Sequence, residues 1–214
     1  MTHARGFRFL ATVAMIALLA LPGSAALAGA LTQDAATRYV TDMGNRAVSV
    51  LAAQGDTRIR QSEFARLMVE AVDFEAVAMA TLGRAARSIS EQEKQEFTQL
   101  FAAHVIDAAI KRFGDVQIVG FQVGEGRPQP NGDIKVQAVI ERAGGEPLAI
   151  DWRVRLSGGS PRIGDIEFAG YSLIIHYRGE FERSREVSVP ALIGRLRDLN
   201  RNSLALNTVR RELR

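Results

Sequence analysis

Cysteine is absent from this chain of 214 residues. Without a thiol the chain offers no disulfide bond, no thiolate zinc site, no cysteine-ligated iron–sulfur cluster and no cysteine nucleophile. Its surplus of positive charge is small, because 27 basic side chains stand against 24 acidic ones, and such a surplus does not indicate a nucleic-acid partner. The apolar and charged fractions, 47% and 24%, are those of an ordinary globular protein.

Long apolar runs are also missing, apart from one near the N-terminus. There Arg5 and Arg8 precede an almost wholly apolar stretch over residues 10–21, and Ala26 and Ala28 are small residues at the two positions that a signal peptidase reads. The stretch is shorter than the roughly 20 residues that a transmembrane helix needs. This layout favours a cleaved secretory signal peptide over an uncleaved membrane anchor.

We therefore assign residues 1–28 to a signal peptide, cleaved before Gly29 or a few residues later. Residues 29–214 are then expected to form a single domain, which is large enough to bury a core without disulfide bonds. We expect that domain to be exported and soluble. Its last residues, 201–214, are polar and basic, and we expect them to fray.

Apolar residues recur at helical spacing in the first half of the chain. The expected helices cover residues 34–54, 62–72, 74–82 and 90–113. The last one begins with a capping box, in which the Ser90 hydroxyl and the Glu93 carboxylate each accept a hydrogen bond from an amide at the helix start. This helix carries apolar stripes on two sides, whereas a surface helix needs only one. We therefore expect apolar material on both sides of it.

The second half alternates apolar and polar residues with a period of two, which is typical of half-buried antiparallel strands. The expected strands cover residues 116–123, 134–140, 148–156, 162–168 and 171–178, and a last helix begins near Ser188. Asn131-Gly132 and Gly144-Gly145 are turn signals, and Gly124-Glu125-Gly126 is interpreted as a hairpin loop. The expected fold class is α+β: N-terminal helices packed on a curved antiparallel sheet of about four or five strands, a C-terminal helix, and an apolar cavity between the layers.

Side chains suited to catalysis are scarce. Beyond the signal peptide the histidines are His104 and His176, and the sequence holds none of the common hydrolase, phosphate-loop or zinc-protease motifs. His104 precedes Asp107 by three residues on one expected helix, so the two could share a face and hydrogen-bond. A histidine satisfied by a neighbouring carboxylate is the simpler interpretation. We expect no enzyme, no metal and no cofactor, and we favour binding over catalysis.

Arginine gathers in the strand region, its exit and the last helix. The cluster consists of Arg153, Arg155, Arg162, Arg178, Arg183, Arg185, Arg195, Arg197 and Arg201. One interpretation is a solvated surface balanced by neighbouring carboxylates. The other is a docking face for acidic partners or anionic headgroups.

Residues 170–181, Gly-Tyr-Ser-Leu-Ile-Ile-His-Tyr-Arg-Gly-Glu-Phe, resemble the G-x-S-L…Y-R-x-x-F signature of the MlaC-type proteins, also called the toluene-tolerance auxiliary family. Further similarities follow the family's order along the chain. They lie at Asp73-Phe74, residues 82–87, Glu93, Phe97, Phe101, residues 163–166 and residues 190–196. The resemblance covers nearly all of the chain after the signal peptide.

This resemblance implies a periplasmic phospholipid carrier with a mixed α+β fold. Such proteins shuttle glycerophospholipid between an outer-membrane lipoprotein/porin complex and an inner-membrane ABC transporter complex, which maintains outer-membrane lipid asymmetry. We expect phospholipid as the ligand, those two complexes as partners, no nucleic acid, and a monomer. Alternatives are a hopanoid or other polycyclic lipid as cargo, or a small-ligand enzyme or binder on a cone-shaped α+β fold that uses His104 and Asp107.

The expected lipid-binding residues come from one helix and one face of the strands. They are Phe97, Phe101, Val105 and Ala109 of the helix, and Trp152, Val154, Tyr171, Leu173 and Ile175 of the strands. Arg153 and Arg178 are weaker candidates for contact with a headgroup or a partner. Each methylene that leaves water for an apolar slot contributes about 0.8 kcal/mol, so a slot of this kind needs no reactive side chain.

Overall fold

The computed structural model describes residues 30–114, 116–183 and 188–213. The signal peptide predicted for residues 1–28 lies outside these ranges. The elements follow in the order α1 (Gln33–Ala52), α2 (Thr57–Ala71), α3 (Phe74–Leu82), the 3-10 helix η1 (Gly83–Arg87), α4 (Glu91–Phe113), β1 (Ile118–Pro128), β2 (Ile134–Arg142), β3 (Gly145–Ser157), β4 (Ser160–Phe168), β5 (Tyr171–Ser172), α5 (Leu173–Arg183), α6 (Val189–Leu199) and α7 (Ala205–Glu212). The chain forms helices, then an antiparallel sheet and then further helices, and this order confirms the expected α+β class.

The five strands form one open sheet in which each strand pairs with the next, in the order β1-β2-β3-β4-β5. Along β2, Ile134, Val136, Ala138 and Ile140 are buried, as the alternating pattern predicts. The opposite face carries charges, and the Lys135 ammonium lies 2.6 Å from a Glu167 carboxylate oxygen across the sheet. One face therefore packs against the helices while the other faces water.

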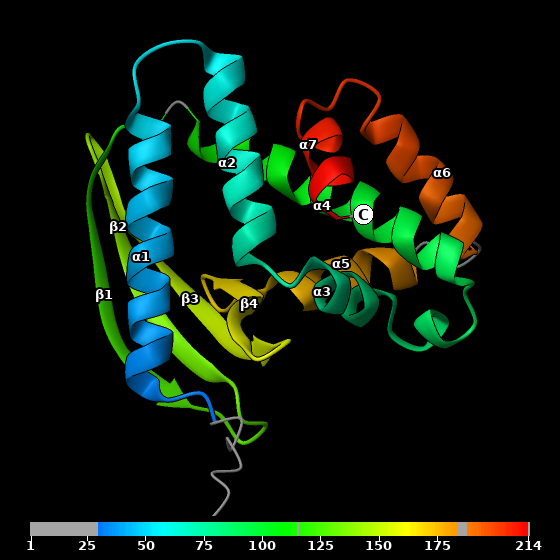
Figure 1. The fold of residues 1–214 in the computed structure, drawn as a ribbon, viewed down its shortest axis with the longest axis horizontal. Helices are drawn as coiled ribbons and strands as arrows, with labels where there is room; N and C mark the ends of the chain where they lie inside the picture. Colours follow the sequence, from blue (N-terminus) through cyan, green and yellow to red (C-terminus); the bar gives the residue numbers. More distant parts are fainter. Residues whose placement is uncertain (1–29, 115, 184–187, 214) are drawn as a thin grey trace, which may run out of the picture.

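Helix α1 lies along the buried face of the sheet, closest to β1 (Figure 1). Glycines permit the close approach at two points. A Cβ on Gly44 would overlap the ring of Phe121, and a Cβ on Gly126 would lie 3.0 Å from the carbonyl oxygen of Gln33. The Gly126 amide also donates a hydrogen bond to the Thr37 hydroxyl at 3.0 Å. Side chains at these two positions would hold the helix away from β1.

The capping box predicted at Ser90 and Glu93 is present, and it starts the long helix α4. This helix runs through the middle of the helical half, against α2 and α3 and against α6 and α7 (Figure 1). Phe97, Phe101 and Ile106 are fully buried. The prediction that this helix contacts apolar material on more than one side is confirmed.

Three local predictions are wrong. Gly124-Glu125-Gly126 is not a hairpin loop but part of β1, which continues to Pro128 with an irregular register between Val123 and Gly126. Residues 171–178 are not a strand, because only Tyr171 and Ser172 pair with β4 and helix α5 begins at Leu173. The expected second helix begins earlier than residue 62, since the Asp56 carboxylate caps it and accepts from the Arg58 amide at 2.7 Å.

The C-terminal tail also differs from the expectation of fraying. Residues 205–212 form helix α7, which packs on α2 and α4. Val209 is fully buried, and the Ser62 and Thr208 hydroxyls share a hydrogen bond of 3.1 Å. The tail's composition is polar, but its few apolar residues lie on one side of a helix, and their burial fixes the segment.

Candidate functional site: an apolar cavity between helices and sheet

A cavity of about 140 Å³ lies between α1, α2 and the end of α4 on one side and the sheet on the other. Its lining residues are all apolar. They are Val40, Met43, Gly44, Ala47, Val48 and Leu51 of α1; Phe64, Leu67, Met68 and Ala71 of α2; Ala109 and Phe113 of α4; and Ile118, Phe121, Ile140, Ile150, Trp152, Ile163 and Ile166 of the sheet. Such a surface binds apolar groups because they leave water on binding, and it requires no particular orientation of the ligand.

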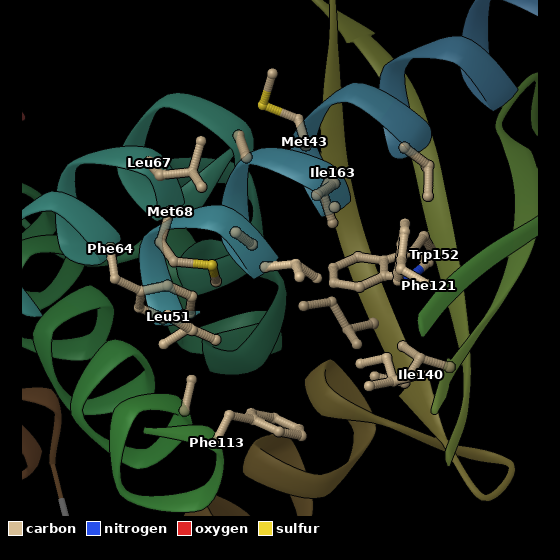
Figure 2. Close-up of a pocket in the computed structure, with 18 of the residues that line it drawn as sticks. Met43, Leu51, Phe64, Leu67, Met68, Phe113, Phe121, Ile140, Trp152 and Ile163 are labelled. Atoms are coloured by element: carbon tan, nitrogen blue, oxygen red, sulfur yellow. The ribbon is translucent and has the colours of Figure 1, made fainter. Parts of the chain in front are cut away.

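Figure 2 shows how the two walls face each other across the cavity. Leu51, Phe64 and Met68 come from the helices, and Phe121 and Trp152 come from the sheet. The walls come from segments that are distant in sequence, so the cavity exists only once α1 and α2 lie on the sheet. The apolar cavity predicted between the layers is therefore present.

Two of the nine predicted lining residues, Ala109 and Trp152, lie in the wall of this cavity. Phe97, Phe101 and Val105 are buried one to three turns earlier along α4, among α3, α5 and α6. The Phe101 ring meets that of Tyr177 edge-on, with centroids 5.0 Å apart. These three side chains build the helical core, and the structure does not bring them to the cavity.

The remaining four predicted residues are also elsewhere. Val154 is fully buried in a cluster with Ala36 and Ile134 near the start of α1. Leu173 is half-buried against the helical core, and Tyr171 and Ile175 are 78% and 70% exposed. The expected strand over residues 171–178 would have put these three on one sheet face, but only Tyr171 lies in a strand, and Leu173 and Ile175 lie in the first turn of α5.

The helical wall of the cavity was not predicted, although its signal is in the sequence. Met43, Ala47 and Leu51 recur at helical spacing in α1 and form its apolar stripe. Periodicity shows that such a stripe is covered, but it does not distinguish plain core from the wall of a cavity.

The residues of the signature hold α5 in place rather than line the cavity. Asp165, which is 2% exposed, accepts hydrogen bonds from the Ser172 hydroxyl at 2.6 Å and from the Ile174 amide at 3.3 Å. The Arg178 guanidinium donates to the carbonyl oxygen of Ala80, near the end of α3, at 2.5 and 3.2 Å. The signature thus fixes where α5 begins and which helix it packs against.

Several arginines of the predicted basic cluster are neutralised by contacts within the chain. The Arg153 guanidinium lies 2.8 Å from Glu167 and 3.8 Å from the buried Asp165. Arg197 forms a bidentate pair with Glu96 at 2.7 and 2.8 Å. These contacts favour the balanced surface over a docking face at Arg153 and Arg197, and the bonds from Arg178 to a carbonyl oxygen of α3 give that side chain a structural role.

In the part of the chain that the structure describes, no hydrogen bond joins His104 to Asp107. Its ring instead meets the Tyr177 ring edge-on, with centroids 5.7 Å apart. Burial lowers the pKa of His104 and raises the pKa of Tyr177 to about 12, because a low-dielectric surrounding disfavours the charged form of each. Both rings are therefore neutral near pH 7 and act as packing groups.

Neither a membrane-spanning helix nor a metal-binding cluster occurs in the part of the chain that the structure describes. Within residues 30–114, 116–183 and 188–213, no helix has the length and apolar character to cross a membrane. The same ranges contain no cluster of three or more His, Asp or Glu side chains arranged to hold a metal ion.

The fold and its site define a class: an α+β protein with a wholly apolar cavity enclosed between a helical layer and an open antiparallel sheet. The family model described as MlaC protein matches residues 41–198, which runs from the middle of α1 to the end of α6. The chain belongs to the MlaC family. This confirms the family that the signature in residues 170–181 indicated.

A solved structure has the same fold. It is the phospholipid-binding protein from Ralstonia solanacearum, determined in complex with a phospholipid. The two chains are 22% identical, and their structures superpose with a TM-score of 0.66 over 79% of this chain and 98% of the other. A comparison with curated proteins returned no match.

Proposed function

We propose that this protein binds phospholipid, with acyl chains held in the cavity between α1, α2 and the sheet. The observation that carries the proposal is the cavity's lining, which is apolar at every position. An acyl chain there gains about 0.8 kcal/mol for each methylene removed from water. Membership of the MlaC family and the fold shared with a phospholipid-binding protein support the same ligand.

The size of the cavity adds a requirement. A cavity of about 150 Å³ admits a molecule the size of benzene, and this one measures about 140 Å³. Two acyl chains need more room, so the helical wall has to move away from the sheet during loading. Helix α1 belongs to this wall: it packs on β1, β2 and α2, and a short loop joins it to α2.

We further propose the cellular role that the family suggests. The protein is exported and loses its signal peptide, works in the periplasm as a monomer, and carries glycerophospholipid between an outer-membrane complex and an inner-membrane ABC transporter complex. It is a binding protein and not an enzyme, and it needs no cofactor. N-terminal sequencing of the protein from its own periplasm is expected to start at Gly29 or a few residues later.

The ligand is tested by native mass spectrometry of the protein purified from its own periplasm. A phospholipid mass bound to the intact chain is expected, and the same spectrum identifies a hopanoid if that is the cargo. A protein that carries no lipid and takes up none from phospholipid vesicles would contradict the proposal.

The place of binding is tested with the single tryptophan of the chain, Trp152, which lies in the cavity wall. Vesicles whose phospholipids carry bromine on the acyl chains serve as the lipid source, because bromine quenches indole fluorescence on contact. We expect quenching that persists after the vesicles are removed. Lipid loading without quenching would place the chains outside this cavity.

A further inference from the structure

A second pocket adjoins the apolar cavity and shares two of its residues, Leu51 and Phe64. This neighbouring pocket encloses about 150 Å³ and lies between the end of α1, the first turns of α2 and the end of α4. It differs in character, because Thr57, Arg60, Gln61 and Lys111 contribute polar walls. Leu51 and Phe64 thus lie between the apolar cavity and these polar groups.

The exposure of α1 increases toward this end of the cavity. Ala36 and Val40, at the start of the helix, are 0% and 2% exposed. Leu51, at its end, is only half-buried, and the loop that follows it is exposed. In Figure 1 this loop, between α1 and α2, lies at one extremity of the helical layer.

Two cations stand in this second pocket, and none of its described lining residues is a carboxylate. The Arg60 guanidinium donates to the Ala53 carbonyl oxygen at 3.1 Å and to the Thr57 hydroxyl at 3.4 Å. These bonds hold it at the α1–α2 loop and use two of its five N–H donors. Among the described residues, Lys111 has no hydrogen bond or ion pair that would occupy its ammonium group.

We propose that Arg60 and Lys111 bind the phosphate of a phospholipid headgroup whose acyl chains lie in the apolar cavity. This inference rests on the proposed function. The chemistry fits, because a phosphodiester is an anion with strong acceptor oxygens, and guanidinium and ammonium groups are its usual donors. The shared residues Leu51 and Phe64 then contact the glycerol end of the chains.

The arrangement predicts that the protein prefers a lipid with a phosphate headgroup over a lipid that lacks one. The test uses isothermal titration calorimetry with dioctanoyl phosphatidylglycerol and with dioctanoyl glycerol, which have identical chains. The wild-type protein is expected to bind the phosphate-bearing lipid at least about tenfold more tightly, since charge-assisted hydrogen bonds form only with that lipid. The double variant Arg60→Gln, Lys111→Gln is expected to bind the two lipids with affinities that differ by less than about twofold.

A matched control removes the same charge elsewhere. Arg84→Gln with Arg87→Gln changes two exposed arginines of η1, which is remote from this pocket, and is expected to keep the wild-type preference. The single variant Lys111→Gln covers the case in which loss of the Arg60 contacts unfolds the chain. Its preference for the phosphate-bearing lipid is expected to be about threefold smaller than that of the wild type, because one of two charged donors remains.

The outcomes separate this inference from the proposed function. A double variant that keeps the full preference overturns the headgroup site, and so does a wild-type protein that binds both lipids equally, although it still binds lipid. A wild-type protein that binds neither lipid contradicts the proposed function itself. Glycerol 3-phosphate is titrated as the free anion, and if it binds as tightly as the phospholipid, the pocket is a small-anion site and the assignment to a lipid headgroup is wrong.

Discussion

Arg46 of α1 and Glu70 of α2 form a bidentate ion pair, in which the guanidinium donates to both carboxylate oxygens at 2.6 and 2.7 Å. Their neighbours Met43, Ala47 and Ala71 line the cavity. The pair therefore joins the two helices of the cavity's helical wall at a half-exposed edge of that wall. Any motion that separates these two helices has to break it.

The Arg46–Glu70 pair is expected to stabilise the protein in a pH-dependent way. Hydrogen bonding to Arg46 lowers the pKa of Glu70, so the native state favours the carboxylate more than the unfolded chain does. The contribution is present above the ordinary glutamate pKa and is lost as the pH falls through the lowered value. Since both side chains are about half exposed, we expect about 0.2–1 kcal/mol at pH 7.

This contribution is measured by a double-mutant cycle of Arg46→Ala and Glu70→Ala with urea unfolding. The coupling free energy is expected at pH 7 and should vanish in strong acid and in high salt. A coupling that is unchanged when Glu70 is protonated would contradict the ionic interpretation. If α1 and α2 separate during loading, the same variants should also take up lipid faster.

Filling the cavity is expected to block lipid loading. Ala109 lies in the cavity wall, so Ala109→Trp places an indole where an acyl chain would lie. The neighbouring Ala108 is exposed, and Ala108→Trp is therefore the matched control in the same turn of α4. We expect the Ala109 variant to lose most of its copurified phospholipid, and the Ala108 variant to load normally, as counted by native mass spectrometry.

A folded Ala109→Trp protein that loads lipid like the wild type would show that the chains lie elsewhere. Circular dichroism and thermal unfolding check that the variant is folded. Overpacking costs about 1–3 kcal/mol, which a chain with a core of this size can tolerate.

The close approach of α1 to β1 is expected to depend on Gly44. Alanine is normally the better helix former by about 1 kcal/mol, but here its Cβ would overlap the Phe121 ring. We therefore expect Gly44→Ala to destabilise the protein by about 1–3 kcal/mol. A Cβ added to Gly194 of α6 would meet no atom within 4 Å, and Gly194→Ala is expected to stabilise by about 0.4–1 kcal/mol.

Urea unfolding of both glycine variants measures this difference. Phe121→Leu combined with Gly44→Ala should recover part of the loss, because the smaller side chain leaves room for the added methyl group. Equal stabilisation by the two alanines would show that α1 does not pack on Phe121 as the structure has it.

The buried Asp165 is expected to be essential for the start of α5. It accepts from the Ser172 hydroxyl and from the amides of Ile166 and Ile174, and a buried carboxylate in such contacts is costly to alter. We expect Asp165→Asn to destabilise by about 1.5–3 kcal/mol, and Ser172→Ala by about 1 kcal/mol. Thermal unfolding measures both, and hydrogen exchange at the first turn of α5 should rise in the Asp165 variant first.

Local sequence signals predicted several elements well. The Ser90–Glu93 capping box started α4 where expected, and α3 covers the expected residues 74–82, where the Asp73 carboxylate accepts from the Ala76 amide at 3.1 Å. These signals act within a few residues of themselves. For the same reason the alternating residues of β2 and β3 predicted both strands and most of their buried face, although Leu156 at the end of β3 is exposed.

The start of α5 could not be predicted in this way. Leu173, Ile174 and Ile175 form a short apolar run, which periodicity alone does not assign to a strand or a helix. The helix is favoured by Asp165 of β4. Its carboxylate accepts hydrogen bonds from the Ser172 hydroxyl and the Ile174 amide, at the point where α5 begins. That contact exists only when β4 and β5 lie side by side.

The sequence by itself determined the class of this protein. It is an α+β chain of the MlaC family, in which helix α4 is apolar on two sides and the sheet has one buried face. Only the tertiary structure decided which apolar residues form core and which enclose space. Phe97 and Phe101 are as apolar as Phe64 and Phe121, and no local pattern separates them. The physical reason is that a cavity is set by how closely whole layers approach, and that distance depends on glycines, caps and ion pairs from distant parts of the chain.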